Sequence, residues 1–126
     1  MTEEKLIQLV EKIESQTRAG NLNWEGTATD NEFQATLGNF VLRVARHVSS
    51  DGSADFIINF VDKGGSDLES LSDIQLAKIA RKAGGYGVNA YDLMESIFKN
   101  AKRTALGVEK ALDDILSELD DLPPPE

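Results

Sequence analysis

The chain contains no cysteine and a single histidine, His47, among its 126 residues. Without cysteine there can be no disulfide, no thiolate zinc site, no iron–sulfur cluster and no cysteine nucleophile. One histidine cannot supply a two-histidine metal site. No pair among the 22 acidic residues stands out by its spacing as an acid–base couple. We therefore expect no cofactor, no metal and no catalytic site, and a protein that is not an enzyme.

Long apolar runs and an excess of basic charge are also absent. The longest apolar stretch, residues 56–61, contains Asn59 and falls far short of the ~20 residues that cross a bilayer. The first residues are acidic, unlike the basic start of a secretory signal. The net charge of −9 disfavours nucleic-acid phosphates and anionic membranes, and it permits a basic protein partner. We expect a cytoplasmic protein that binds neither nucleic acid nor membrane directly.

The composition fits one folded domain. Apolar residues make up 40% of the chain and charged residues 28%, as in ordinary globular proteins. A chain of this length buries about two-thirds of its unfolded surface, so that it needs no metal or disulfide to fold. We expect residues 1–120 to form a single domain. The acidic, proline-rich residues 121–126 are expected to form a disordered tail.

The N-terminal half predicts a helix followed by strands. Residues 3–19 carry apolar side chains at helical spacing, namely Leu6, Leu9, Val10 and Ile13, with Thr17 continuing the stripe. Alternating apolar and polar residues predict strands over residues 32–37, 40–47 and 55–62, and a short further strand at 67–71. Short turn sequences separate these strands. The pattern predicts an antiparallel meander of three or four strands.

The C-terminal half changes to helical periodicity. Ser72 and Gln75 form a capping-box pattern that opens one helix, and Asn89 can cap a second. The glycine-rich residues 84–87 follow a helix rather than a strand, which favours an interhelical turn over a phosphate-binding loop. Gly107 separates the second of these helices from a last helix, which runs to about residue 120. Segregated strands and helices predict an α+β fold, with three C-terminal helices packed on one face of the sheet.

The last helix combines an apolar stripe with acidic charge. Its apolar residues Val108, Leu112, Ile115, Leu119 and Leu122 follow an a/d pattern over two heptads. Packing on the protein's own sheet or preceding helix is the favoured interpretation, and a dimer or partner seam is the alternative. Residues 109–126 hold seven acidic side chains and one lysine, a net charge of −6. Such a segment is either a solvated end or a docking element for a basic partner.

These observations favour a small, non-catalytic protein-interaction module of the adaptor, immunity or inhibitor type. We expect a protein partner, with basic charge, to bind the C-terminal helix and its acidic end, and the hydrophobic edge of the sheet to add to the contact. A homodimer through the same helix stays open. The expected partner-binding residues are Leu112, Asp113, Asp114, Ile115, Glu118, Leu119, Asp120 and Asp121.

The alternative is a small-ligand-binding domain or a modest enzyme with a pocket between sheet and helices. Its candidate lining residues are Trp24, Arg43, His47 and Tyr86. The competing interpretation has Trp24 covering the core, with its indole N–H bonded to a backbone carbonyl. In that interpretation His47 is a surface or packing residue at the end of a strand. The general pattern is similar to that of small acidic bacterial proteins with a three-stranded meander and a helical C-terminal half. That likeness implies no activity.

Overall fold

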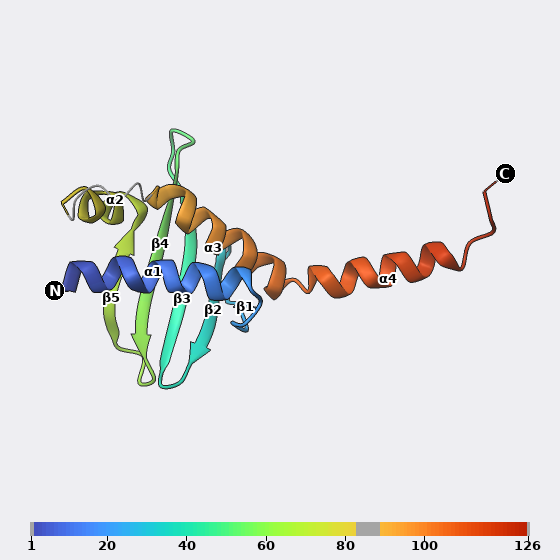
Figure 1. Ribbon diagram of the computed structural model, residues 1–126, viewed down its shortest axis with the longest axis horizontal. Helices are drawn as coiled ribbons and strands as arrows, with labels where there is room; N and C mark the ends of the chain where they lie inside the picture. The colour runs from blue at the N-terminus through green and yellow to red at the C-terminus, as the bar shows by residue number, and fades with distance from the viewer. Residues whose placement is uncertain (1, 83–88, 126) are drawn as a thin grey trace.

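The computed structural model of the protein describes residues 2–82 and 89–125. A first helix is followed by five strands and then three further helices (Figure 1). The elements are α1 (Thr2–Arg18), β1 (Glu25–Gly26), β2 (Glu32–Leu37), β3 (Phe40–Val48), β4 (Ala54–Asp62), β5 (Asp67–Ser72), α2 (Asp73–Lys82), α3 (Ala90–Ala105) and α4 (Val108–Asp120). The predicted α+β class is confirmed.

The sheet is an antiparallel meander in which every strand pairs with the next along the chain, in the order β1-β2-β3-β4-β5. It has five strands rather than the expected three or four. The short strand predicted at residues 67–71 is present as β5. The additional strand is β1, which pairs Glu25 with Gln34 and Gly26 with Phe33. Two residues are too few to show an alternating pattern, so the sequence gives no signal for β1.

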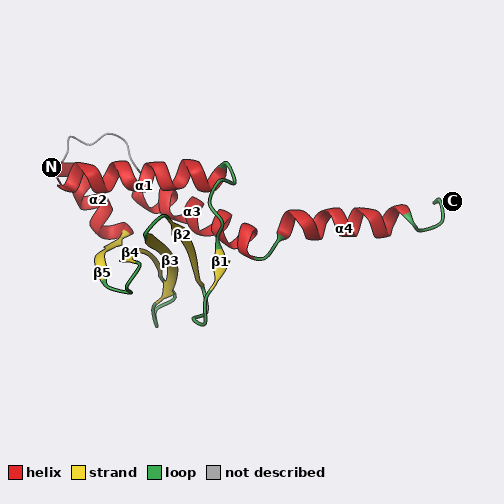
Figure 2. Ribbon diagram, turned by 90° about the horizontal axis from the view of Figure 1, so that it is seen from below, coloured by secondary structure: helices red, strands yellow, loops and turns green. Residues whose placement is uncertain are grey.

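Helices α1, α2 and α3 lie together on one face of this sheet (Figure 1, Figure 2). Helix α3 contacts β1 to β4, helix α2 contacts β4 and β5, and α1 packs against both of these helices. Because strand residues alternate between faces, Leu42 and Val44 point to the helices, whereas Arg43 points to the opposite, open face. The sheet therefore has one covered and one solvent-facing side, as antiparallel sheets commonly do.

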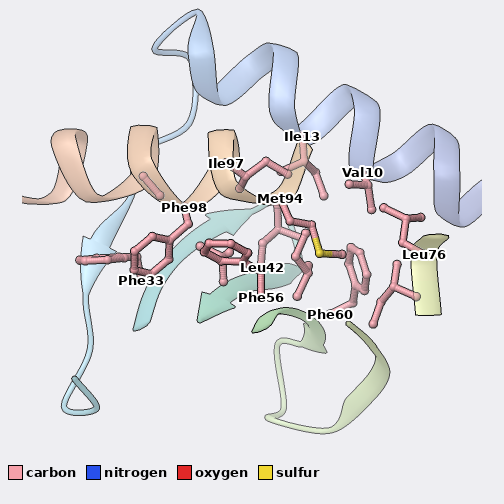
Figure 3. Packing of buried hydrophobic residues seen from close by; sticks show 14 of the residues in the cluster. Val10, Ile13, Phe33, Leu42, Phe56, Phe60, Leu76, Met94, Ile97 and Phe98 are labelled. Atoms are coloured by element: carbon pink, nitrogen blue, oxygen red, sulfur yellow. The ribbon is translucent and has the colours of Figure 1, made fainter. Parts of the chain in front are cut away.

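The core lies between this helical layer and the sheet. Figure 3 shows Val10 and Ile13 from α1 and Met94 and Ile97 from α3 gathered above strand residues such as Phe56. The apolar face predicted for residues 3–19 is correct apart from one position. Leu9 is 45% exposed, and Ile7 is buried in its place.

Two predicted helix starts are confirmed. At α2, the backbone N–H of Gln75 donates to Ser72 Oγ, and the N–H of Ser72 donates to Gln75 Oε1, at 3.1 and 2.9 Å. At α3, the N–H of Asp92 donates to Asn89 Oδ1 at 3.1 Å. The predicted interhelical turn at 84–87 lies outside the described residues.

The last helix differs from the expectation. Helix α4 follows α3 directly and extends away from the folded body instead of packing on the sheet (Figure 1, Figure 2). No residue of α4 is buried. At the junction Gly107 has φ +64°, a left-handed conformation that glycine adopts without strain. Helices α1 to α3 already cover the sheet, so that no uncovered part of the core is left for α4.

Candidate functional site

Among the elements of the described residues, α4 carries the largest group of exposed apolar side chains. Leu112, Ile115, Leu116 and Leu119 are 46–59% exposed, and Leu122 just beyond the helix is 61% exposed. Monomeric proteins expose few contiguous apolar patches, and larger ones mark interaction sites. The favoured interpretation of this stripe, packing within the protein, is wrong for Leu112, Ile115, Leu119 and Leu122. These side chains are exposed to solvent, whereas Val108 at the start of the helix is half-buried.

All of the predicted partner-binding residues lie in α4 except Asp121, which directly follows the helix. Leu112, Ile115 and Leu119 form part of the apolar face. The acidic members Asp113, Asp114, Glu118, Asp120 and Asp121 are all exposed beside or behind that face. Leu116 is not among the predicted partner-binding residues, although its spacing of four from Leu112 places it on the same face. The signal was present, but the strict a/d pattern leaves this position out.

Two ion pairs order the first half of α4. Arg103 Nη2 at the end of α3 lies 2.8 Å from Glu109 Oε1 and spans the Gly107 junction. Within α4, Lys110 Nζ lies 3.0 Å from Asp114 Oδ2. Both pairs are exposed to solvent, where such contacts contribute at most about 1 kcal/mol. The Arg103–Glu109 pair biases the direction of α4 without holding it rigidly, and the Lys110–Asp114 pair supports the helix itself.

The basic residues at the helix ends have local roles. Arg81 and Lys82 lie in the last turn of α2, and Lys102 and Arg103 lie in the last turn of α3. Cations there face the negative end of the helix dipole. Arg103 is also paired with Glu109. Their positions are explained by helix stability, without a phosphate ligand.

The open face of the sheet carries a row of polar side chains. In the strand register one residue of each strand is aligned across the sheet, namely Glu25, Gln34, Arg43, Asn59 and Ser70. Arg43 Nε donates to Gln34 Oε1 at 3.3 Å, and Gln34 Nε2 donates to Glu25 Oε1 at 3.4 Å. The row separates Val41 and Val61 on one side from Ala45 and Ile57 on the other.

The residues proposed for a ligand pocket do not converge. Trp24 is 2% exposed and lies in the core on the helical side. Its Nε1 donates to Thr17 Oγ1 at 3.1 Å, so the predicted burial is correct but the predicted backbone acceptor is not. Arg43 projects from the open face, and His47 is exposed opposite Asp55 near the end of β3. Tyr86 lies outside the described residues.

Two hollows lie on the part of the surface that residues 2–82 and 89–125 form. One holds about 290 Å³ where the ends of α1 and α3 meet the start of α4, and its lining includes Arg18 and Arg103. Both guanidinium groups are already paired, with Glu14 and Glu109 respectively. A second, flatter hollow of about 270 Å³ lies between α1, α2 and β5, over Leu6 and Leu71. The first is lined mainly by polar residues and lacks apolar walls, and the second is shallow, whereas ligand sites are concave and mostly apolar.

In the described parts of the chain, no group of three or more His, Asp or Glu side chains is placed to hold a metal ion. Nor is any helix of residues 2–82 and 89–125 long and apolar enough to cross a membrane. Comparison of the chain with protein-family models, with curated proteins and with solved structures gave no match.

Proposed function

We propose that this protein is a small, non-catalytic interaction module that acts in the cytoplasm and binds a protein partner through α4. The observation that carries the proposal is the exposure of four large apolar side chains on one face of a helix that contributes no buried residue to its own fold. Burying such a face stabilises a complex, because each large apolar side chain contributes about 1.5–3 kcal/mol when fully transferred from water.

The spacing of the exposed residues supports binding in a groove. Leu112, Ile115, Leu116 and Leu119 stand at positions i, i+3, i+4 and i+7. Amphipathic helices that insert into hydrophobic grooves of other proteins use anchors at this spacing. In this proposal the folded body serves to present the helix, and the ion pair between Arg103 and Glu109 orients it.

The small-ligand alternative has less support. Trp24 and Arg43 lie on opposite sides of the sheet, and neither residue lines either of the two hollows described above. An adaptor, an immunity protein and an inhibitor all fit a presented helix equally well. They differ in the partner rather than in the residues that bind it.

The test is capture of a partner by N-terminally tagged protein, so that α4 stays free. The unsubstituted chain is compared with the variant Ile115→Ser/Leu119→Ser, in which two apolar side chains of α4 are replaced. The matched control is Leu9→Ser/Ile74→Ser, which removes two apolar side chains of similar exposure, 45% and 52%, from α1 and α2. We expect one stoichiometric partner with the full-length chain and the control, and its loss with the α4 variant.

The captured protein is then purified and titrated against the same three chains by calorimetry. Equal affinity for all three would place the binding site elsewhere and contradict the proposal. If no protein is captured by any folded bait, and a metabolite library raises the melting temperature instead, the ligand-binding alternative replaces it.

A further inference from the structure

We infer that the occupant of the α4 face is a groove on another protein, with an apolar floor and a rim of lysine and arginine, and not a second copy of this chain. The inference rests on the proposed function and specifies its partner. It is carried by the width of the apolar face and by the charges along its edges.

The apolar face is wider than the seam of a two-stranded coiled coil. A coiled-coil seam needs two apolar residues per heptad, at a and d. Between Leu112 and Leu119, α4 exposes Ile115 at d and also Leu116 at e. Three apolar residues per heptad are typical of a helix that packs against two or more elements at once. A single α4 from a second copy would leave part of this face in water.

Carboxylates flank the face on both edges. With about 100° between successive residues, Glu118 lies along one edge, and Asp113 and Asp120 lie along the other. Asp114 and Glu109 have cation partners within the chain, Lys110 and Arg103. Within residues 2–82 and 89–125, the ion pairs found include none to Asp113, Glu118, Asp120 or Asp121.

The position of these carboxylates adds to their effect. Glu118 and Asp120 lie in the last turn of α4, and no basic residue is found there. The C-terminal end of a helix carries the negative end of its dipole, so the potential of the carboxylates and of the backbone have the same sign. A lysine or arginine on a partner's rim is favoured most strongly at this end.

A second copy of this chain would bring like charges together instead of opposite ones. Two α4 helices packed face to face, parallel or antiparallel, bring acidic edges against acidic edges, because the segment after Lys110 contains no basic residue. Juxtaposed like charges disfavour a complex, and complementary charges favour it. The two occupants therefore differ in the sign of their salt dependence. Added salt weakens binding to a basic rim, and it relieves the repulsion between two copies.

The test uses two designed helical hairpins as probes. Both present the same leucine-lined groove, one with lysine at every rim position and the other with glutamate. Their affinities for the full-length chain are measured by fluorescence anisotropy. At low salt we expect the lysine-rimmed hairpin to bind at least about tenfold more tightly than its twin, and raising NaCl to about 0.5 M to remove most of this difference.

Two variants separate the charges from the apolar face. Asp113→Asn/Glu118→Gln/Asp120→Asn/Asp121→Asn should bind both hairpins alike. The control neutralises four exposed acids of the folded body, Glu11, Asp30, Asp67 and Glu69. It has the same total charge and should keep the preference for lysine. Ile115→Ser/Leu119→Ser should lose both hairpins.

Equal binding of the two hairpins by the full-length chain, or binding of neither, would overturn the inference. Sedimentation of the full-length chain tests the other occupant. A dimer that grows stronger with salt and is lost in Ile115→Ser/Leu119→Ser would identify a second copy. Capture of a partner that needs Ile115 but tolerates the four α4 neutralisations would remove this inference and leave the proposed function standing.

Discussion

The indole Nε1 of Trp24 donates a hydrogen bond to Thr17 Oγ1 at 3.1 Å, and both side chains are buried, at 2% and 3% exposure. Trp24 lies in the segment between α1 and β1, and Thr17 lies in the last turn of α1. The bond therefore connects the first helix to the chain that enters the sheet. It satisfies the polar atom of a large side chain whose rings fill the core.

Replacing Thr17 by valine should destabilise the protein, because the valine methyl group cannot accept the indole N–H. Leaving a buried donor unsatisfied costs about 1–3 kcal/mol. The free energy of unfolding is measured by urea titration, with the fluorescence of Trp24, the only tryptophan, as the signal. Thr17→Ser keeps the acceptor and should lose less stability than Thr17→Val. The reverse order would show that the methyl group, and not the hydrogen bond, matters at this position.

Asp73 should stabilise the fold through a hydrogen bond between the start of α2 and strand β4. It is 7% exposed, and its Oδ1 accepts the backbone N–H of Phe56 in β4 at 3.0 Å. Asp73→Ala leaves that buried N–H without its acceptor, and we expect a loss of about 1–3 kcal/mol in the free energy of unfolding. Asp73→Asn keeps an acceptor oxygen and should retain more of the stability. In hydrogen exchange, the Phe56 amide should lose more protection than other β4 amides in the alanine variant, and uniform loss would contradict this assignment.

Removing residues 108–126 should leave the folded body intact, because α4 contributes no buried residue. The one ion pair that joins it to α3, between Arg103 and Glu109, is exposed. We expect the free energy of unfolding to change by less than about 1 kcal/mol, as measured by chemical denaturation. Met94→Ala, at a fully buried position, is the comparison and should cost about 2–5 kcal/mol. A truncation that costs as much as Met94→Ala would mean that α4 packs on the body in solution.

Glu14 should contribute fully to stability above its unfolded-state pKa and should lose this contribution as the pH falls through its lower folded-state pKa. The pKa of Glu14 lies below its ordinary value of 4.5, first because Arg18 hydrogen-bonds to the carboxylate and also because Ser96 does, although burial opposes this. A lowered folded-state pKa means that the stabilisation is present above pH 4.5 and is lost as the pH falls below it. Since Arg18 is 65% exposed, we expect Glu14→Gln to cost less than about 1 kcal/mol at neutral pH.

The same variant should lose stability less steeply than the wild type as the pH is lowered through this range. Thermal unfolding between pH 3 and pH 7 measures both effects. Glu11→Gln, on an exposed position of the same helix, controls for the loss of one negative charge. Parallel curves for wild type and Glu14→Gln would refute the linkage.

Local sequence patterns predicted most of the secondary structure because they act over a few residues. The alternation of residues 32–37 and 40–47 identified β2 and β3, and the capping pattern of Ser72 and Gln75 identified the start of α2. The sequence was ambiguous at two places. Strand β1 is too short to show any periodicity. At the start of α1, Ile7 and Leu9 are both apolar and close to the predicted buried stripe, but only Ile7 is buried.

The candidate site was also predictable only in part from the sequence. The sequence by itself determined that residues 108–120 form an amphipathic helix with acidic edges, because helical spacing and charge are local properties of the chain. Only the tertiary structure decided what that apolar face contacts. Helices α1, α2 and α3 occupy the covered face of the sheet (Figure 2), and Gly107 directs α4 away from it. An apolar stripe shows that a helix is able to be buried, but whether it is buried depends on the surface that the other elements leave uncovered.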